Sequence, residues 1–297
     1  MTQATVLIPT HDHQDTILRA IASIKRQTIQ DFEVFVVGDG VPDRTRELMA
    51  GICAADDRFR FFDNPKGPRT GEPHRHRALQ GAAGKIVCYL ADDDLWLPNH
   101  LESMLEASQE ADFFHALHVG IDHEDKPYFI PSNIQDITVR RLMCHTTANR
   151  FGLTFCGHTL SGYRSLPVGW RTAPEGTPTD LHMWRQFLAH DTIRAKTIFR
   201  ATALGFASPQ RIGWSMDQRL AELDRWLTRS QDAEFPAKLQ GWLLKHACVN
   251  FGRLDMLVQA GLVSERTPAP SAPRSGHRLP RLFRRLFASR HRARLKN

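Results

Sequence analysis

Hydrophobic and polar residues change period repeatedly along the first hundred positions of the chain. Short runs of β-branched and aromatic residues predict strands, whereas apolar residues three or four positions apart predict amphipathic helices. The expected strands are residues 5–8, 32–37, 58–62 and 86–91, and the expected helices are residues 17–24, 43–55 and 74–83. Strands that alternate with helices predict an α/β fold, with a mostly parallel sheet flanked by helices.

The rest of the chain continues this mixture and then changes in composition. A strand pair is expected within residues 113–130, a helix over 135–148, an apolar stretch at 154–163, a short amphipathic helix at 178–190 and two or three helices within 216–260. The run 267–273 alternates Pro with small residues, which is typical of a linker. We therefore expect a domain at residues 1–215, a C-terminal helical extension at 216–263, and a linker with a basic amphipathic tail at 264–297.

Three consecutive aspartates, Asp92, Asp93 and Asp94, directly follow the apolar run 86–91. Their like charges repel one another, so a positive partner is expected. Mg²⁺ and Mn²⁺ prefer carboxylate oxygens and keep positions open for substrate phosphates. Open α/β sheets bind ligands beyond the carboxyl ends of their strands. An isolated acidic triplet is more often a solvated turn or a helix cap, and the surrounding pattern favours the metal site here.

Other strand ends carry polar side chains as well. Thr10 and Asp12 follow the first expected strand, and Asp39 follows the second. They are expected to border the same crevice as the aspartate triplet. The ordinary alternatives are capping of the helix that begins near Ile17 and a turn beside glycine.

The charge of the chain is unevenly distributed. The chain has 297 residues, of which 41% are hydrophobic and 24% charged, and a formal net charge of +7. Nine Lys and Arg residues and no Asp or Glu lie between Arg274 and the C-terminus, so the remainder carries a net charge of −2. A near-neutral body with a basic appendage argues against a specific nucleic-acid-binding body.

Targeting signals and cysteines point to a reducing compartment. The sequence enters a strand within a few residues, so no signal peptide is expected. No apolar run approaches the roughly 18 residues of a spanning helix. The five cysteines are an odd number without a CxxC pair, namely Cys53, Cys88, Cys144, Cys156 and Cys248. We expect a cytoplasmic protein.

The basic tail has an amphipathic pattern. Apolar residues recur at helical spacing between arginines, at Leu279, Leu282, Phe283, Leu286 and Phe287. Such a helix fits an anionic membrane surface, so residues 278–294 are expected to attach the protein peripherally to the inner face of the membrane. The alternatives are a disordered basic tail, or a helix that docks on the body or on a partner chain.

Several motifs, taken in order, resemble family 2 glycosyltransferases with the GT-A fold. The motifs are Ile8-Pro9-Thr10, the run from Ser23 to Val34, Val37-Gly38-Asp39-Gly40, Arg75, Gly84-Lys85-Ile86-Val87 with Ala91-Asp92-Asp93-Asp94, Gly162-Tyr163-Arg164-Ser165 with Gly169-Trp170, and Thr179 to Arg185. The resemblance covers roughly residues 4–205. Each motif alone is weak, but their common order and spacing are specific.

The resemblance implies a GT-A, Rossmann-like domain whose residues 1–97 bind the nucleotide and whose residues 98–215 face the acceptor. It implies metal-dependent, inverting transfer from a nucleotide-sugar, most simply a UDP-sugar, to a hydroxyl of a saccharide or lipid-linked acceptor. Surface polysaccharide or glycolipid synthesis is the expected setting. The implied cofactor is Mn²⁺ or Mg²⁺.

The same resemblance assigns roles to individual residues. Asp93, helped by Asp92 or Asp94, is the expected metal ligand, with Asp94 favoured as the helper, and Asp180 is the expected general base. Trp184 is expected on the acceptor side, although an aromatic at helical spacing is more often a core residue. The expected nucleotide contacts are Pro9, Thr10 and Asp12 at the first strand end, Asp39 on the base, Arg75 on the phosphates and Asp92 near the ribose.

Two other readings remain open from the sequence. His11, His13 and Asp15 fit the start of a metallo-β-lactamase-like zinc hydrolase site. The second alternative is a non-catalytic nucleotide-binding protein that has kept the GT-A fold.

Overall fold

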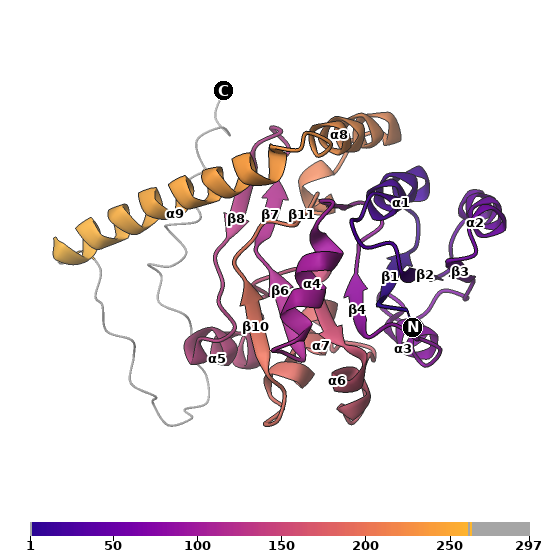
Figure 1. Ribbon diagram of the computed structural model, residues 1–297, viewed down its shortest axis with the longest axis horizontal. Coiled ribbons are helices and arrows are strands. Elements are labelled where there is room, and N and C mark those ends of the chain that lie inside the picture. Colours follow the sequence, from indigo (N-terminus) through magenta and orange to yellow (C-terminus); the bar gives the residue numbers. More distant parts are fainter. Residues whose placement is uncertain (1, 261, 263–297) are drawn as a thin grey trace. The chain divides into compact units, whose positions relative to one another are not determined.

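The computed structural model describes residues 2–260 and residue 262 (Figure 1). The chain divides into two units, residues 1–244 and residues 245–297, and the boundaries expected at residues 215 and 263 remain predictions. The sheets, their cores and the candidate site lie in the first unit, and helix α9 continues into the second. The predicted linker and basic tail, 264–297, lie outside the described residues.

The main sheet has seven strands in the order β10-β6-β9-β4-β1-β2-β3. Their bounds are β1 Ala4–Thr10, β2 Phe32–Gly38, β3 Phe59–Phe62, β4 Ile86–Tyr89, β6 Phe113–Ala116, β9 Cys156–Thr159 and β10 Ala195–Ile198. Only β9 runs against its neighbours within this sheet, since β4 and β6 both pair with it antiparallel. The expected mostly parallel α/β sheet is therefore confirmed.

Helices connect the parallel strands and cover the sheet. Their bounds are α1 Ile17–Lys25, α2 Asp43–Ala55, α3 Glu72–Leu79, α4 His100–Ser108, α5 Ile137–His145, α6 Leu160–Ser165, α7 Thr179–Leu188, α8 Met216–Arg229 and α9 Phe235–Gln259, with short 3-10 turns η1 Gln14–Thr16, η2 Leu153–Phe155 and η3 Ser208–Arg211. Helix α4 packs on β4, β6, β9 and β10 (Figure 1). No helix of the described residues is long and apolar enough to cross a membrane.

Two small sheets lie beside the main sheet and carry a second core. Strands β5 (Leu95–Trp96) and β11 (Ala203–Leu204) pair antiparallel, as do β7 (His118–Ile121) and β8 (Pro127–Ile130). Buried apolar residues of β5, β7 and β11 pack with buried residues of α8, including Leu223 and Trp226. This packing places α8 beside Asp93, which follows β4.

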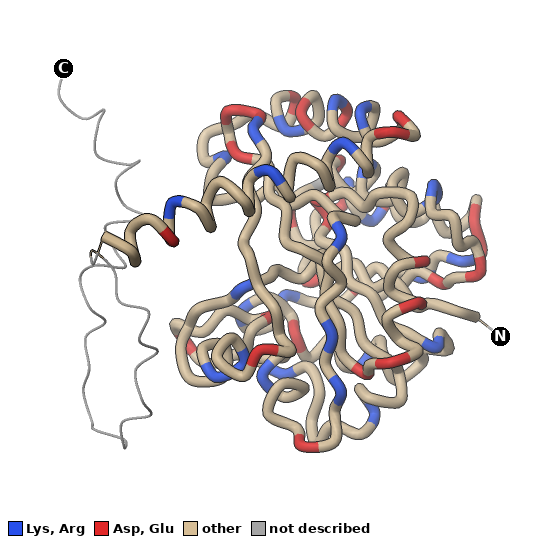
Figure 2. Tube along the Cα trace, turned by 60° about the vertical axis from the view of Figure 1, so that its left-hand side comes forward, with Lys and Arg blue, Asp and Glu red and all other residues tan. Residues whose placement is uncertain are grey.

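The aspartates themselves follow a fully apolar strand. All of β4 is buried, and Tyr89 packs in an aromatic cluster with Trp170 and Trp184. Acidic and basic residues are mixed along the helices of the first unit rather than separated by sign (Figure 2). No region of one sign stands out along these helices.

The sequence pattern was least informative after residue 112. The stretch expected to be one strand pair contains β6, which joins the main sheet, and the separate β7–β8 hairpin. The apolar stretch 154–163 is divided between β9 and α6. Strands of two to four residues are too short to give a clear alternation.

Candidate active site

Neighbouring strands of the sheet end together and leave a cavity beyond their carboxyl ends. Strands β2 and β4 both pair with β1 in parallel, so the residues that follow them meet at one edge. The cavity there has a volume of about 240 Å³. Its walls are Pro9, Thr10, His11, His13, Asp39, Lys66, Arg69, Thr70, Arg75, Ala91, Asp92 and Asp93.

Asp39 occupies one end of this cavity and is held by the loop before α3. The Gly67 N–H donates to its Oδ1 at 2.5 Å, and Lys66 Nζ donates to its Oδ2 at 2.7 Å. His74 Nε2 lies 3.7 Å from Oδ1. Gly71 has φ +69°, and a Cβ on it would stand 2.6 Å from the Asp39 carboxyl carbon. Glycine at position 71 therefore allows the loop to close over Asp39.

The other end of the cavity holds a pair of carboxylates. His13 Nδ1 lies 2.7 Å from Asp92 Oδ1, and this hydrogen bond raises the pKa of His13 to about 9. Ser208 Oγ and Arg219 Nη2 donate to Asp93 Oδ2 at 2.7 and 2.8 Å. Asp92 Oδ2 is buried and has no hydrogen-bond partner among the described residues. One oxygen of Asp92 is thus available to a ligand.

His13, Asp92 and Asp93 form a group that fits a divalent cation. One ligand atom from each lies within 4.8 Å of the others. Imidazole with carboxylate is a donor set that Mn²⁺ accepts, and carboxylates alone suit Mg²⁺. The unpartnered buried oxygen of Asp92 is the observation that favours an ion here, because an unmet buried carboxylate oxygen is costly.

Asp94, predicted as a second metal ligand, lies outside this group in the structure. Its Oδ1 accepts from the Phe206 N–H at 2.7 Å, and its Oδ2 accepts from the Thr154 hydroxyl. Burial raises the pKa of Asp94 to about 7. Asp92, expected near the ribose or as a helper of Asp93, lies with His13 and Asp93.

Arg75 and Asp180 lie near enough to influence each other. Arg75 Nη2 donates to the backbone oxygen and hydroxyl of Thr70 at 2.8 and 3.0 Å, and its guanidinium lies 4.8 Å from the centroid of the Trp170 ring. Asp180 lies in the first turn of α7, and its Oδ1 accepts from the Leu181 N–H at 2.8 Å. Burial raises the pKa of Asp180, whereas the nearby charge of Arg75 lowers it.

The remaining predicted residues divide between cavity and core. Pro9 and Thr10 line the cavity, and the Thr10 hydroxyl is buried without a partner among the described residues. Asp12 is exposed and is not part of the cavity wall. Trp184 is fully buried beside Tyr89 and Trp170, which is the core position that the sequence left as the alternative to a contact with the acceptor.

The geometry of His11, His13 and Asp15 does not support the zinc-hydrolase hypothesis. Asp15 pairs with Arg44 at 3.2 Å instead of approaching the histidines. Among the described residues the metal-compatible group takes His13 from that motif and adds Asp92 and Asp93 from the end of β4.

Sequence reasoning missed four side chains that shape the cavity: Lys66, Arg69, Ser208 and Arg219. Lys66 and Arg69 lie in the loop before α3, where a basic residue carries no local signal. Ser208 and Arg219 reach Asp93 across 115 and 126 positions. The packing of α8 on the second core brings Arg219 there, and Ser208 lies in η3, which the Arg211–Glu222 pair joins to α8, so no local pattern identifies them.

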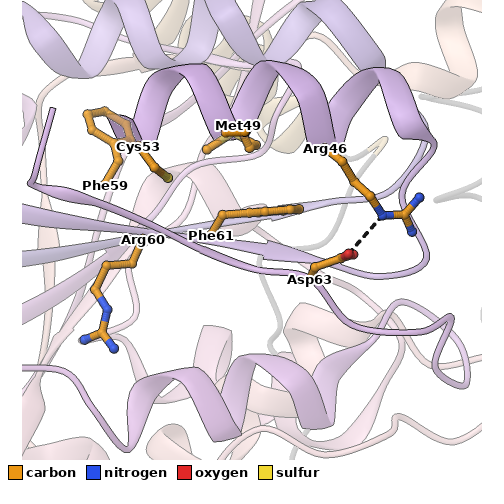
Figure 3. Close-up of a pocket in the computed structure, with 8 residues that line it drawn as sticks. Arg46, Met49, Cys53, Phe59, Arg60, Phe61 and Asp63 are labelled. Atoms are coloured by element: carbon orange, nitrogen blue, oxygen red, sulfur yellow. Dashed lines mark hydrogen bonds and ion pairs between the residues drawn. The ribbon is translucent and has the colours of Figure 1, made fainter. Parts of the chain in front are cut away.

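A larger cavity of about 550 Å³ lies elsewhere, between α2 and the edge strand β3 (Figure 3). Its floor is apolar, with Met49 and Phe61, and the Arg46–Asp63 pair at 2.9 Å lies at one end. It contains none of the carboxylates described above. We therefore place the candidate active site in the smaller cavity at the strand ends.

Comparison with known proteins matches this fold and this segment of the chain. Residues 5–166 match the family model described as glycosyl transferase family 2. The structure resembles TarS of Staphylococcus aureus, solved with UDP-GlcNAc, with a TM-score of 0.52 and 16% identity over 77% of this chain and 66% of that one. At this identity the likeness shows the fold alone, which is of the GT-A type.

Two curated relatives are bacterial glucosyltransferases. A GalNAc(5)-diNAcBac-PP-undecaprenol beta-1,3-glucosyltransferase of Campylobacter jejuni is 29% identical over 110 residues, 37% of this chain and 36% of that protein. A UDP-Glc:alpha-D-GlcNAc-diphosphoundecaprenol beta-1,3-glucosyltransferase of Escherichia coli is 28% identical over 101 residues, 34% of this chain and 39% of that protein. The match thus spans little more than a third of either relative. Because the family model covers more than half of the sequence and includes both ends of the cavity, this chain belongs to glycosyl transferase family 2.

Proposed function

We propose that this protein transfers a sugar from a UDP-sugar to a hydroxyl acceptor with inversion at the anomeric carbon. The observation that carries the proposal is the single cavity that has Asp39 at one end and the His13–Asp92–Asp93 group at the other. A nucleoside diphosphate has a matching arrangement, with a hydrogen-bonding base at one end and two phosphates at the other.

The base of the donor is assigned to Asp39. Its carboxylate accepts hydrogen bonds, so it suits the imide N–H of uracil. Lys66 and Gly67 already donate to both oxygens, which fixes the orientation of the carboxylate. The UDP-GlcNAc complex of the similarly folded TarS supports the choice of uridine as the first nucleoside to test.

The diphosphate is assigned to the basic side of the cavity and to a divalent cation. Arg75 and Arg69 line the wall and suit phosphate oxygens. His13, Asp92 and Asp93 would hold Mn²⁺ or Mg²⁺, which supplies Lewis-acid stabilisation of the charge that grows on the leaving phosphate.

Asp180 is proposed as the general base. The acceptor hydroxyl oxygen attacks the anomeric carbon on the face opposite the diphosphate, and the bond from that carbon to the phosphate oxygen breaks. The hydroxyl proton passes to the Asp180 carboxylate, and UDP leaves with the bonding pair. Burial raises the pKa of Asp180, which makes it a better proton acceptor than a solvated aspartate.

The acceptor is proposed to be a saccharide carried on a lipid diphosphate. Both glucosyltransferase relatives are named for acceptors on an undecaprenol diphosphate. A cytoplasmic protein attached at the inner face of the membrane would suit such an acceptor, and the segment proposed for the attachment, 278–294, lies outside the described residues. Vesicle co-sedimentation with and without residues 274–297 tests this part.

The donor site is tested by calorimetric titration of UDP, with and without Mn²⁺. We expect Mn²⁺-dependent binding that Asp93→Asn removes and that Asp39→Asn weakens. GDP and dTDP, titrated in parallel, test the base assignment. Absence of binding by any of the three diphosphates would contradict the proposal.

The non-catalytic alternative keeps the same cavity and differs only in turnover. It predicts UDP binding without release of UDP from any UDP-sugar in the presence of lipid-linked or free saccharide acceptors. Release of UDP that depends on both acceptor and Asp180 would exclude it.

A further inference from the structure

Arg219 places a positive charge directly on the carboxylate group assigned to the metal. Its Nη2 donates to Asp93 Oδ2 at 2.8 Å, beside the hydroxyl of Ser208 at 2.7 Å on the same oxygen. The Arg219 and Asp93 side chains keep only 12% and 9% of their area exposed. A pair shielded from water in this way interacts more strongly than a surface pair.

Helix α8 does not depend on Arg219 for its position. Arg211 donates twice to Glu222 at 2.5 and 2.6 Å, with 0% and 1% of the two side chains exposed. Arg19 donates twice to Asp224 at 2.9 and 2.8 Å. The buried Arg211–Glu222 pair and the buried apolar face of the helix already hold α8 in place, and the half-exposed Arg19–Asp224 pair adds little. A third anchor at Asp93 is therefore not needed to hold the helix.

The guanidinium of Arg219 also has an N–H donor that makes no hydrogen bond among the described residues. Its Nε is buried and has no partner among the described residues. A guanidinium carries five N–H donors in a planar fork and keeps its charge at every accessible pH. Arg219 is not itself in the cavity wall, but it contacts Asp93, which is, and a buried donor without a partner next to that wall suits an anionic ligand oxygen.

We propose that Arg219 is a positioning residue and a fixed cation of the donor site, which shares Asp93 with the divalent cation and adds positive charge beside the diphosphate. This inference rests on the proposed function. The effects on the two ligands have opposite signs. A positive charge next to a cation site weakens binding of the cation, and the same charge strengthens binding of a diphosphate.

The opposite effects of the Arg219 charge on Mn²⁺ affinity and UDP affinity distinguish this proposal from a purely structural role. If Arg219 only kept Asp93 or α8 in place, its removal would weaken binding of Mn²⁺ and UDP together. If it acts by charge, Arg219→Gln binds Mn²⁺ more tightly and UDP more weakly, each by roughly tenfold. Arg219→Lys keeps the charge and is expected to stay near the wild-type protein for both ligands.

The experiment measures two affinities in the full chain. Mn²⁺ alone is titrated by its effect on water-proton relaxation, and UDP is titrated by calorimetry at saturating Mn²⁺. Asp224→Asn serves as the matched control, because it breaks another contact of α8 without touching Asp93. It is expected to leave both affinities unchanged, and thermal melting confirms that every variant folds.

The outcomes distinguish this inference from the proposed function. Absence of UDP binding to the wild-type protein would remove the proposed function and the inference with it. UDP binding to the wild-type protein, combined with no gain in Mn²⁺ affinity or no loss of UDP affinity in Arg219→Gln, would overturn the role of Arg219 alone.

Discussion

The strand-end region (residues 4–96) and the distal region (residues 150–229) contribute different kinds of residue to one site. The strand-end region supplies Asp39, Asp92 and Asp93, which line the cavity. The distal region supplies Arg219, which neutralises Asp93, and Asp180, which is proposed to take the proton. The ligand-facing acids are thus encoded by local strand ends. Asp39 and Asp92 find their basic partners, Lys66 and His13, in the same region, whereas Asp93 is paired by Arg219 from 126 positions away.

The adjacent residues Asp93 and Asp94 contact the distal region in different ways. Asp93 faces the cavity and is paired by Arg219 and Ser208, whereas Asp94 turns to Thr154 and the Phe206 N–H. Residues of the distal region thus pair with Asp93 at the cavity, and they hydrogen-bond to Asp94 where the distal region packs on the strand-end region.

The largest effect is expected from Asp180→Asn. An amide cannot take the acceptor proton, so kcat should fall by roughly 10²- to 10⁴-fold. UDP binding should stay near the wild-type value, because the proposed role of Asp180 is on the acceptor side. Release of UDP from a UDP-sugar with a saccharide acceptor measures the first quantity, and calorimetry measures the second. Loss of UDP binding as well would make Asp180 structural.

Glu222→Gln tests whether the distal region depends on its buried ion pair. The change leaves Arg211 charged and without its carboxylate in a place where neither side chain is exposed beyond 1%. The free energy of unfolding is expected to fall by about 3–5 kcal/mol. Urea unfolding followed by circular dichroism measures this.

Asp224→Asn on the same helix is the control for that change. Asp224 is about half exposed, at 52%, so its pair with Arg19 contributes little to stability. An equal loss of stability in both variants would show that burial of the Arg211–Glu222 pair is not what matters.

The pH dependence of stability contrasts buried histidines with the histidine of the site. Burial lowers the pKa of His158 to about 4 and of His100 and His115 to about 3. Their neutral forms are required in the fold, so stability is full above the unfolded pKa of about 6.5. It falls as the pH drops from there toward about 4, by about 1.4 kcal/mol per pH unit for each histidine.

His13 has the opposite sign. Its pKa is raised to about 9, so its contribution is present below pH 6.5 and is lost as the pH rises through about 9. Urea unfolding at pH 5.5, 7.5 and 9.5 separates the two effects. His158→Gln should make the acid side less steep, and an unchanged slope would contradict the assignment of acid sensitivity to these buried rings.

Much of the strand-end region could be predicted from sequence, because its main-sheet strands are apolar runs that alternate with helices. Asp39 and Asp93 follow apolar strands, and parallel strands bring such ends together. The partners in the distal region could not be predicted, because Arg219 looks like any surface arginine on an amphipathic helix. The position of Trp184 could not be predicted either, since helical spacing does not distinguish an aromatic side chain in the core from one that binds a ligand.

The smallest effect is expected from Asp94→Asn, the change that tests the comparison most directly. Both Asp94 oxygens bind protein donors, so an amide can still accept from the Phe206 N–H and stay in place. Mn²⁺-dependent UDP binding should change by less than about threefold, whereas Asp93→Asn removes it. Calorimetry of the two variants side by side measures this difference. If Asp94→Asn abolished Mn²⁺-dependent binding as Asp93→Asn does, Asp94 would have to turn toward the cavity, and the distal region would be part of the metal site itself rather than its support.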